Sequence, residues 1–131
     1  MPTKDQHVGQ SLHNHNVSGL LAQHAGEALD WEVTTLFYSA VHMVEARIDM
    51  VMAKVHTDEA RMNYSRMSAK AKTRHGLRQE FVDTYFEQAK AAYRALSAKC
   101  RRVRYECMPL TQLDVDSARI WHEEVKKVLA C

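Results

Sequence analysis

The segment FYSAVHMVEA, residues 37–46, carries polar side chains at helical spacing inside an otherwise apolar run. At about 100° per residue, Tyr38, His42 and Glu45 fall with Asp49 in one narrow band of a helical wheel, beside the apolar stripe. Half-buried polar groups of this kind need hydrogen-bonding partners. Histidine titrates near neutral pH, so the band contains a residue type suited to acid–base chemistry.

A later segment supplies partners for this band. Tyr93 and Arg104 lie at the edge of the apolar stripe of a second helix. An arginine placed there needs a carboxylate to offset its desolvation, and Glu45 or Asp49 is the expected counter-charge. Such a cluster either fixes the register of the two helices or lines a groove that binds phosphate. The predicted polar cluster consists of Tyr38, His42, Glu45, Tyr93 and Arg104.

Four residues are candidates for catalysis on a phosphate ester. His42 and His75 would act as acid–base groups, and Arg78 and Arg104 would hold phosphate with their planar guanidinium groups. The run TRHGLR, residues 73–78, places His75 and Arg78 on one side of a helical turn. The alternative for this pair is simple exposure to solvent.

No metal site and no cofactor is predicted. A site made of His42, Glu45 and His75 has no recognised ligand spacing. The run HNHN, residues 13–16, suggests a metal site or an HNH nuclease. Such nucleases need a strand-rich fold, and no segment here alternates with period two.

The basic residues are concentrated in two windows. Residues 61–78 contain six Lys or Arg, residues 94–104 contain five, and neither window contains an acid. The windows hold 11 of the 18 basic residues, which leaves 7 basic and 16 acidic residues elsewhere. This division indicates either one basic face for a polyanion or two solvated helix faces. The predicted nucleic-acid-binding residues are Arg61, Arg66, Lys70, Lys72, Arg74, Arg78, Arg101 and Arg102.

Helices are expected to position all of these residues. The chain has 131 residues, 46% of them hydrophobic, with only 4 Gly and 2 Pro, which predicts one all-α domain. Apolar residues at spacings of three, four and seven predict amphipathic helices joined by a polar loop at residues 56–71. We expect a four- to five-helix up-and-down bundle over residues 17–131, after a flexible segment at residues 1–16. The predicted helices are 17–29, 31–55, a piece starting near 73, 83–107 and 116–129.

The compartment is predicted from what the chain lacks. No stretch approaches the roughly 18 apolar residues of a membrane span, and the N-terminus has no signal-peptide run. The three cysteines show no C-x-x-C spacing, as expected for reduced thiols. We therefore expect a cytoplasmic protein without membrane contact.

Several motifs resemble those of the bacterial HEPN-domain superfamily. They are D-W-x-x-x-x-x-F-Y-x-A-x-H-x-x-E-A at residues 30–46, H-x-x-R at 75–78, Y-x-x-L-S at 93–97 and R-x-x-R-Y at 101–105. The resemblance covers roughly residues 14–107. It implies an all-α bundle that is often a homodimer and is commonly associated with RNA. Many members are ribonucleases of toxin, antiviral or RNA-processing systems, and others are binding modules or partners of small nucleotidyltransferases.

The ribonuclease signature of that family is missing. It is an arginine followed four to six residues later by a histidine. The Arg-to-His intervals here have eight, eight and two intervening residues, at Arg47–His56, Arg66–His75 and Arg119–His122. We therefore expect a HEPN-like module that binds RNA or a nucleic-acid-processing partner and lacks nuclease activity. The alternatives are a metal-independent ribonuclease of toxin or defence type and a homodimeric protein-interaction module.

Overall fold

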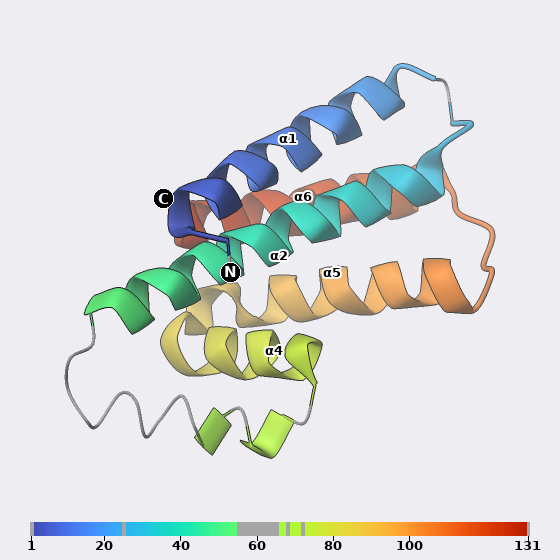
Figure 1. Ribbon diagram of the computed structural model, residues 1–131. Coiled ribbons are helices and arrows are strands. Elements are labelled where there is room, and N and C mark those ends of the chain that lie inside the picture. The colour runs from blue at the N-terminus through green and yellow to red at the C-terminus, as the bar shows by residue number, and fades with distance from the viewer. Residues whose placement is uncertain (1, 25, 55–65, 68, 72, 131) are drawn as a thin grey trace.

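The computed structural model describes residues 2–24, 26–54, 66–67, 69–71 and 73–130, and these residues form helices and no strand (Figure 1). The predicted all-α bundle is thereby confirmed. None of the described helices combines the length and the apolar character needed to cross a membrane. The helices are α1 (Lys4–Ala22), α2 (Leu29–Lys54), α4 (Arg74–Tyr85), α5 (Glu87–Tyr105) and α6 (Gln112–Leu129).

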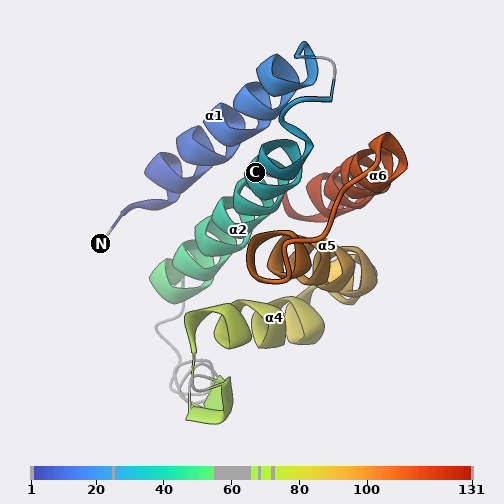
Figure 2. The same cartoon turned by 90° about the vertical axis from the view of Figure 1, so that its right-hand side faces the viewer.

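Helix α2 is the centre of the bundle (Figures 1 and 2). It packs against α1, α4, α5 and α6, and it runs antiparallel to α1 and to α5. Val33, Ala40 and Val44 of its predicted apolar stripe are fully buried. A second side, with Ser39 and Ala46, is also fully buried, because α1 covers it. Small side chains on that side let the two helices approach closely.

Helix α1 corrects the predicted N-terminal region. The helix begins at Lys4, whereas the prediction placed its start at residue 17 and a flexible segment before it. A capping box explains the start: Thr3 Oγ1 accepts a hydrogen bond from the Gln6 amide, and the Gln6 side chain accepts one from the Thr3 amide. Asp49 of α2 accepts a hydrogen bond from the Lys4 amide over 2.7 Å. Its negative charge lies at the N-terminal, positive end of the α1 dipole and so stabilises the start of the helix. The proposed boundary at residue 16 therefore lies inside a helix.

Small serines dock α1 onto α2. Ser11 Oγ donates to the carbonyl oxygen of Ser39 over 2.8 Å, and Ser39 Oγ donates to the carbonyl oxygen of Ser11 over 2.9 Å. Both residues are buried. The predicted helix 17–29 ends at Ala22 instead, and sequence periodicity missed the part before residue 17 because its contact face relies on serines rather than on a stripe of large apolar residues.

The region after residue 73 contains three helices where the prediction had two and a short piece. Thr73 caps α4 by accepting from the Gly76 amide at 3.0 Å, close to the predicted start. The predicted helix 83–107 is divided at Phe86, whose φ of −135° and ψ of 57° end α4 before α5 begins. Helix α6 starts earlier than the predicted residue 116, because Thr111 and Asp114 form a second capping box.

Candidate nucleic-acid interface

Glu45 of α2 binds two arginines of α4. Its Oε1 accepts from Arg74 Nε at 2.8 Å and from Arg78 Nε at 2.7 Å, and its Oε2 pairs with Arg74 Nη2. Burial opposes ionisation of Glu45, but the hydrogen bonds from the two guanidinium groups outweigh it and lower the pKa of the carboxyl. The predicted pairing of Glu45 with Arg104 is therefore wrong, because α4 supplies both of its partners.

Arg104 lies at the surface and is stabilised by aromatic rings. Its Nη1 donates to Tyr38 Oη at 2.7 Å, and its guanidinium carbon lies 5.8 Å from the Tyr38 ring centroid and 5.7 Å from that of Tyr105. Arg104 is exposed, so the desolvation that would have required a carboxylate does not arise. Planar stacking on rings is a favourable environment for a guanidinium group.

The remaining members of the predicted polar cluster have other surroundings. His42 Nδ1 lies 2.9 Å from Nδ1 of His7 on α1, and burial, followed by the charges of His7 and Arg78, lowers the pKa of His42. Tyr93 is a core residue, 1% exposed, whose ring lies 6.0 Å from that of Phe37, and burial raises the pKa of its hydroxyl. The members of the expected cluster therefore lie in different surroundings. His42 contacts α1, Tyr93 is in the core and Glu45 pairs with α4. Tyr38 and Arg104 contact each other near the surface.

A groove runs between α2, α4 and α5. We call it the arginine groove, and it is lined by Phe37, Tyr38, His75, Ser97, Cys100, Arg101, Arg104 and Tyr105. It continues toward the start of α4 through a second hollow, which shares His75, Ser97 and Arg101. On its other side, Tyr38 and Arg104 also border a hollow with Trp31 and His42. These adjoining hollows form one concave strip.

The charge of the arginine groove is positive. Within the residues that the structure describes, no carboxylate pairs with Arg101 or Arg104. His75 Nδ1 accepts a hydrogen bond from Arg78 Nη1 at 3.2 Å, and the His75 ring stacks on Phe37. Burial lowers the pKa of His75, and the charges of Arg78, Arg101 and Arg104 lower it further. The positive potential of the groove therefore favours the neutral form of His75.

The predicted nucleic-acid-binding residues are distributed unevenly. Arg101 lines the groove, while Arg74 and Arg78 lie nearby with part of their charge offset by Glu45. Arg66 and Lys70 are exposed, and Lys70 lies 3.6 Å from Glu80. Arg102 pairs with Glu106 at 3.4 Å and is not a lining residue. The predicted Arg61 and Lys72 lie outside the described residues.

The four candidate catalytic residues are not brought to one point. His75 and Arg104 line the arginine groove, Arg78 contacts His75, and His42 borders the neighbouring hollow. Of the four, only His75 and Arg104 line the arginine groove, so these residues do not form a catalytic arrangement.

Sequence reasoning assigned no binding role to the aromatic residues Trp31 and Tyr105. Trp31 is 58% exposed and Tyr105 is 74% exposed. The helical wheel contained the signal for Tyr105, because this residue falls opposite the apolar stripe of its helix. Large exposed rings beside arginines provide flat surfaces on which bases stack.

No protein-family model, no curated protein and no solved structure shows a significant match to this chain.

Proposed function

We propose that this protein binds single-stranded RNA in the arginine groove, as a HEPN-like helical module without nuclease activity. The observation that carries the proposal is the pair Arg101 and Arg104, which have no carboxylate partner among the residues that the structure describes and lie beside exposed aromatic rings. Phosphate contacts from arginine supply most of the affinity for nucleic acid, and aromatic stacking supports binding of unpaired bases.

The groove suits unpaired strands better than a duplex. Its lining combines the guanidinium groups of Arg101 and Arg104 with the rings of Tyr38, His75 and Tyr105. Bases reach such rings only when they are unstacked from their partners. Arg104 is already oriented by Tyr38 and Tyr105, so less side-chain entropy is lost when it binds a phosphate.

Fluorescence anisotropy with labelled single-stranded RNA, duplex RNA and single-stranded DNA tests the proposal. Arg101→Ala and Arg104→Ala should each weaken RNA binding by about 5- to 10-fold and reduce the log–log salt slope by about one. Arg102→Ala is the matched control, because Arg102 lies on the same helix but outside the groove and pairs with Glu106. Equal losses in all three variants would point to diffuse attraction. No binding at low salt would contradict the proposal.

A metal-independent ribonuclease is the second candidate function. It is favoured by one observation: His75, with its lowered pKa, lines the same groove as Arg101 and Arg104. A neutral imidazole can accept a proton from the attacking hydroxyl while arginine stabilises the phosphate charge, provided that Arg78 releases His75 Nδ1. RNA cleavage in EDTA, compared between wild type and His75→Ala, separates the two functions. Cleavage lost only in the variant would replace the binding-only proposal.

The family resemblance adds the expectation of a homodimer or of a nucleic-acid-processing protein partner. Light scattering on the purified protein measures the dimer directly. A monomeric mass over a range of concentrations would remove the dimer from the proposal and leave the groove of a single chain as the binding unit.

A further inference from the structure

A second cluster of chemically active side chains lies away from the arginine groove, where α1 meets α6. The ligand atoms of His15, His122 and Glu123 all lie within 4.8 Å of one another. The His15 and His122 rings have centroids 4.5 Å apart at an interplanar angle of 46°. His122 is 1% exposed, whereas Glu123 is exposed at the surface.

The serine pair described above sets the protonation of His122. Each serine hydroxyl has one proton, and Ser11 and Ser39 donate theirs to each other's carbonyl oxygens. His122 Nε2 lies 2.9 Å from Ser39 Oγ, and because the Ser39 proton is directed to the Ser11 carbonyl, the hydrogen-bond network assigns the ring proton to Nε2. The lone pair of His122 is then on Nδ1. An outer hydrogen bond that orients the ring and fixes its tautomer is typical of metal-binding histidines.

The surroundings of both imidazoles disfavour their charged forms. Burial lowers the pKa of His122 to about 4, and burial also lowers the pKa of His15. Neutral rings offer lone pairs at neutral pH. Two cations, Arg119 and Lys126, contribute to these shifts. The guanidinium of Arg119 is held by Glu32 at 2.7 Å and by the Ser18 carbonyl at 3.2 Å, so its charge is partly offset.

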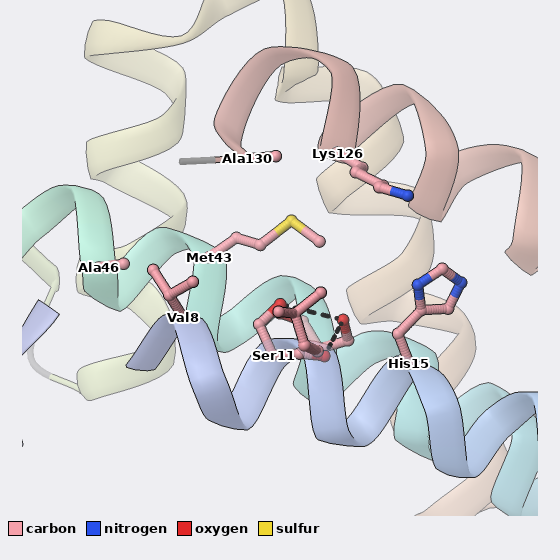
Figure 3. Close-up of a pocket in the computed structure, with 9 residues that line it drawn as sticks. Val8, Ser11, His15, Met43, Ala46, Lys126 and Ala130 are labelled. Atoms are coloured by element: carbon pink, nitrogen blue, oxygen red, sulfur yellow. Dashed lines mark hydrogen bonds between the residues drawn. The ribbon is translucent and has the colours of Figure 1, made fainter. Parts of the chain in front are cut away.

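The positive charge of Lys126 opposes the binding of a cation beside His15 and His122. Figure 3 shows Lys126 on α6, reaching toward His15 of α1 across a pocket that also contains Ser11. The pocket has a volume of about 80 Å³ and is lined by His15 but by neither His122 nor Glu123, so it lies beside the three ligands and does not enclose them. The carboxylate of Glu123 supplies the negative charge that a cation needs beside this amine.

We propose that His15, His122 and Glu123 bind a divalent transition-metal ion of the Zn²⁺ type and that the ion joins α1 to α6. Two imidazole nitrogens and one carboxylate oxygen are a ligand set that Zn²⁺ uses, with water in the fourth position. Tetrahedral Zn²⁺ ligands are about 3.4 Å apart, so the donors would draw together slightly. The exposed Glu123 side chain has the freedom to do so. This site is separate from the proposed RNA groove and does not depend on it.

Isothermal titration of the full chain with ZnCl₂ tests the site. Wild type should bind one ion, and His15→Gln and Glu123→Gln should each weaken binding by at least about 10-fold. Ser39→Ala keeps all three ligands and should weaken binding by a similar factor, through loss of the outer hydrogen bond to His122. Lys126→Met should tighten binding, because it removes a nearby positive charge.

Three controls distinguish this site from other zinc ligands of the chain. His13→Gln changes an exposed histidine of the same helix, His7→Gln changes the pair with His42, and Cys107→Ser removes an exposed thiol. All three should bind Zn²⁺ like wild type. Wild-type affinity in His15→Gln, or a loss confined to His7→Gln or Cys107→Ser, would overturn the proposal.

Thermal unfolding tests the link between α1 and α6. Saturating Zn²⁺ should raise the Tm of wild type by several degrees and leave that of His15→Gln unchanged, because an ion that binds only the folded chain stabilises it. A Tm that does not respond in wild type, despite binding, would show that the ion does not join the two helices.

Discussion

Arg104 at the end of α5 donates a hydrogen bond over 2.7 Å to the hydroxyl of Tyr38 on α2, and its charge has no carboxylate beside it in the described part of the chain. The contact orients a guanidinium group without neutralising it. Glu45, the partner that helix periodicity suggests, is engaged by Arg74 and Arg78. The surface therefore retains an arginine that is ordered and available to an anion.

Removal of the Tyr38 hydroxyl should affect RNA binding more than stability. In Tyr38→Phe the ring remains under Arg104, but the hydrogen bond that orients the guanidinium is lost. We expect RNA affinity to fall by about 3-fold and the free energy of unfolding to change by less than about 1 kcal/mol, because the contact is exposed. Anisotropy and urea titration measure the two effects. The control is Tyr105→Phe, which keeps the second ring and should bind RNA normally.

The ion pairs of Glu45 should contribute measurably to stability. Glu45→Gln removes the charge that holds Arg74 and Arg78 on α2 and should lower the free energy of unfolding by about 2 kcal/mol. Glu80→Gln is the matched control, since its contact with Lys70 is a 3.6 Å surface pair and should contribute little. Similar losses in the two variants would contradict a special role for Glu45.

The same carboxyl predicts a pH dependence of stability. The pKa of Glu45 is lower in the folded chain than its ordinary 4.5, so the unfolded chain binds more protons as the pH falls below 4.5. The stabilisation from Glu45 is complete above pH 4.5 and is lost as the pH falls through its folded pKa. The groups that face it are Arg74, Arg78 and His42, all of them neutral or positive there. The stability difference between wild type and Glu45→Gln should therefore shrink on acidification; a constant difference would refute this.

Two glycines in helices should respond in opposite ways to alanine. A Cβ at Gly76 would lie 2.8 Å from the backbone oxygen of Ala71, so Gly76→Ala should destabilise the start of α4 by about 1 to 3 kcal/mol. A Cβ at Gly9 meets nothing within 4 Å, so Gly9→Ala should stabilise α1 by up to about 1 kcal/mol. Differential scanning calorimetry should show Tm shifts of opposite sign.

The hydrogen bonds between Ser11 and Ser39 should contribute strongly to the stability of the α1–α2 contact. Ser39→Ala removes the hydrogen bond to the Ser11 carbonyl and leaves His122 Nε2 without its partner, which should cost about 1 to 3 kcal/mol. Ser97→Ala, at a half-buried serine of α5, should change stability by less than about 0.5 kcal/mol. Urea titration measures the free energy of unfolding of both variants. Equal losses would show that the Ser11–Ser39 pair has no special role in the packing of α1 on α2.

The sequence predicts the helical elements well where burial uses large apolar residues. The long central helix was predicted at 31–55 and is found at Leu29–Lys54, because its valines and leucines recur with the helical period. The prediction failed at α1, where serines make the contacts, and at Phe86, where one backbone conformation ends a helix. Neither feature changes the hydrophobic period in a way that a wheel detects.

The sequence predicted which types of residue occur at the candidate site but not which of them contact one another. Of the predicted polar cluster, only Tyr38 and Arg104 line the arginine groove, together with His75 and Arg101. Ion pairs form between whichever charges the packed helices bring within about 4 Å, and the sequence does not specify those distances. Glu45 therefore pairs with α4, and His42 with an N-terminal helix that periodicity did not reveal.

By itself, the sequence determined an all-helical chain, a central helix with polar residues at the edge of its apolar stripe, and basic residues gathered in two windows, because composition and period are local properties. Tertiary packing decided which charges meet. It placed Arg101 and Arg104 in a groove with no carboxylate partner in the described part of the chain, and it brought His15 beside His122 from the opposite end of the chain. Those contacts depend on the crossing of helices far apart in sequence, where a shift of a few ångströms decides whether two side chains bind a common ligand.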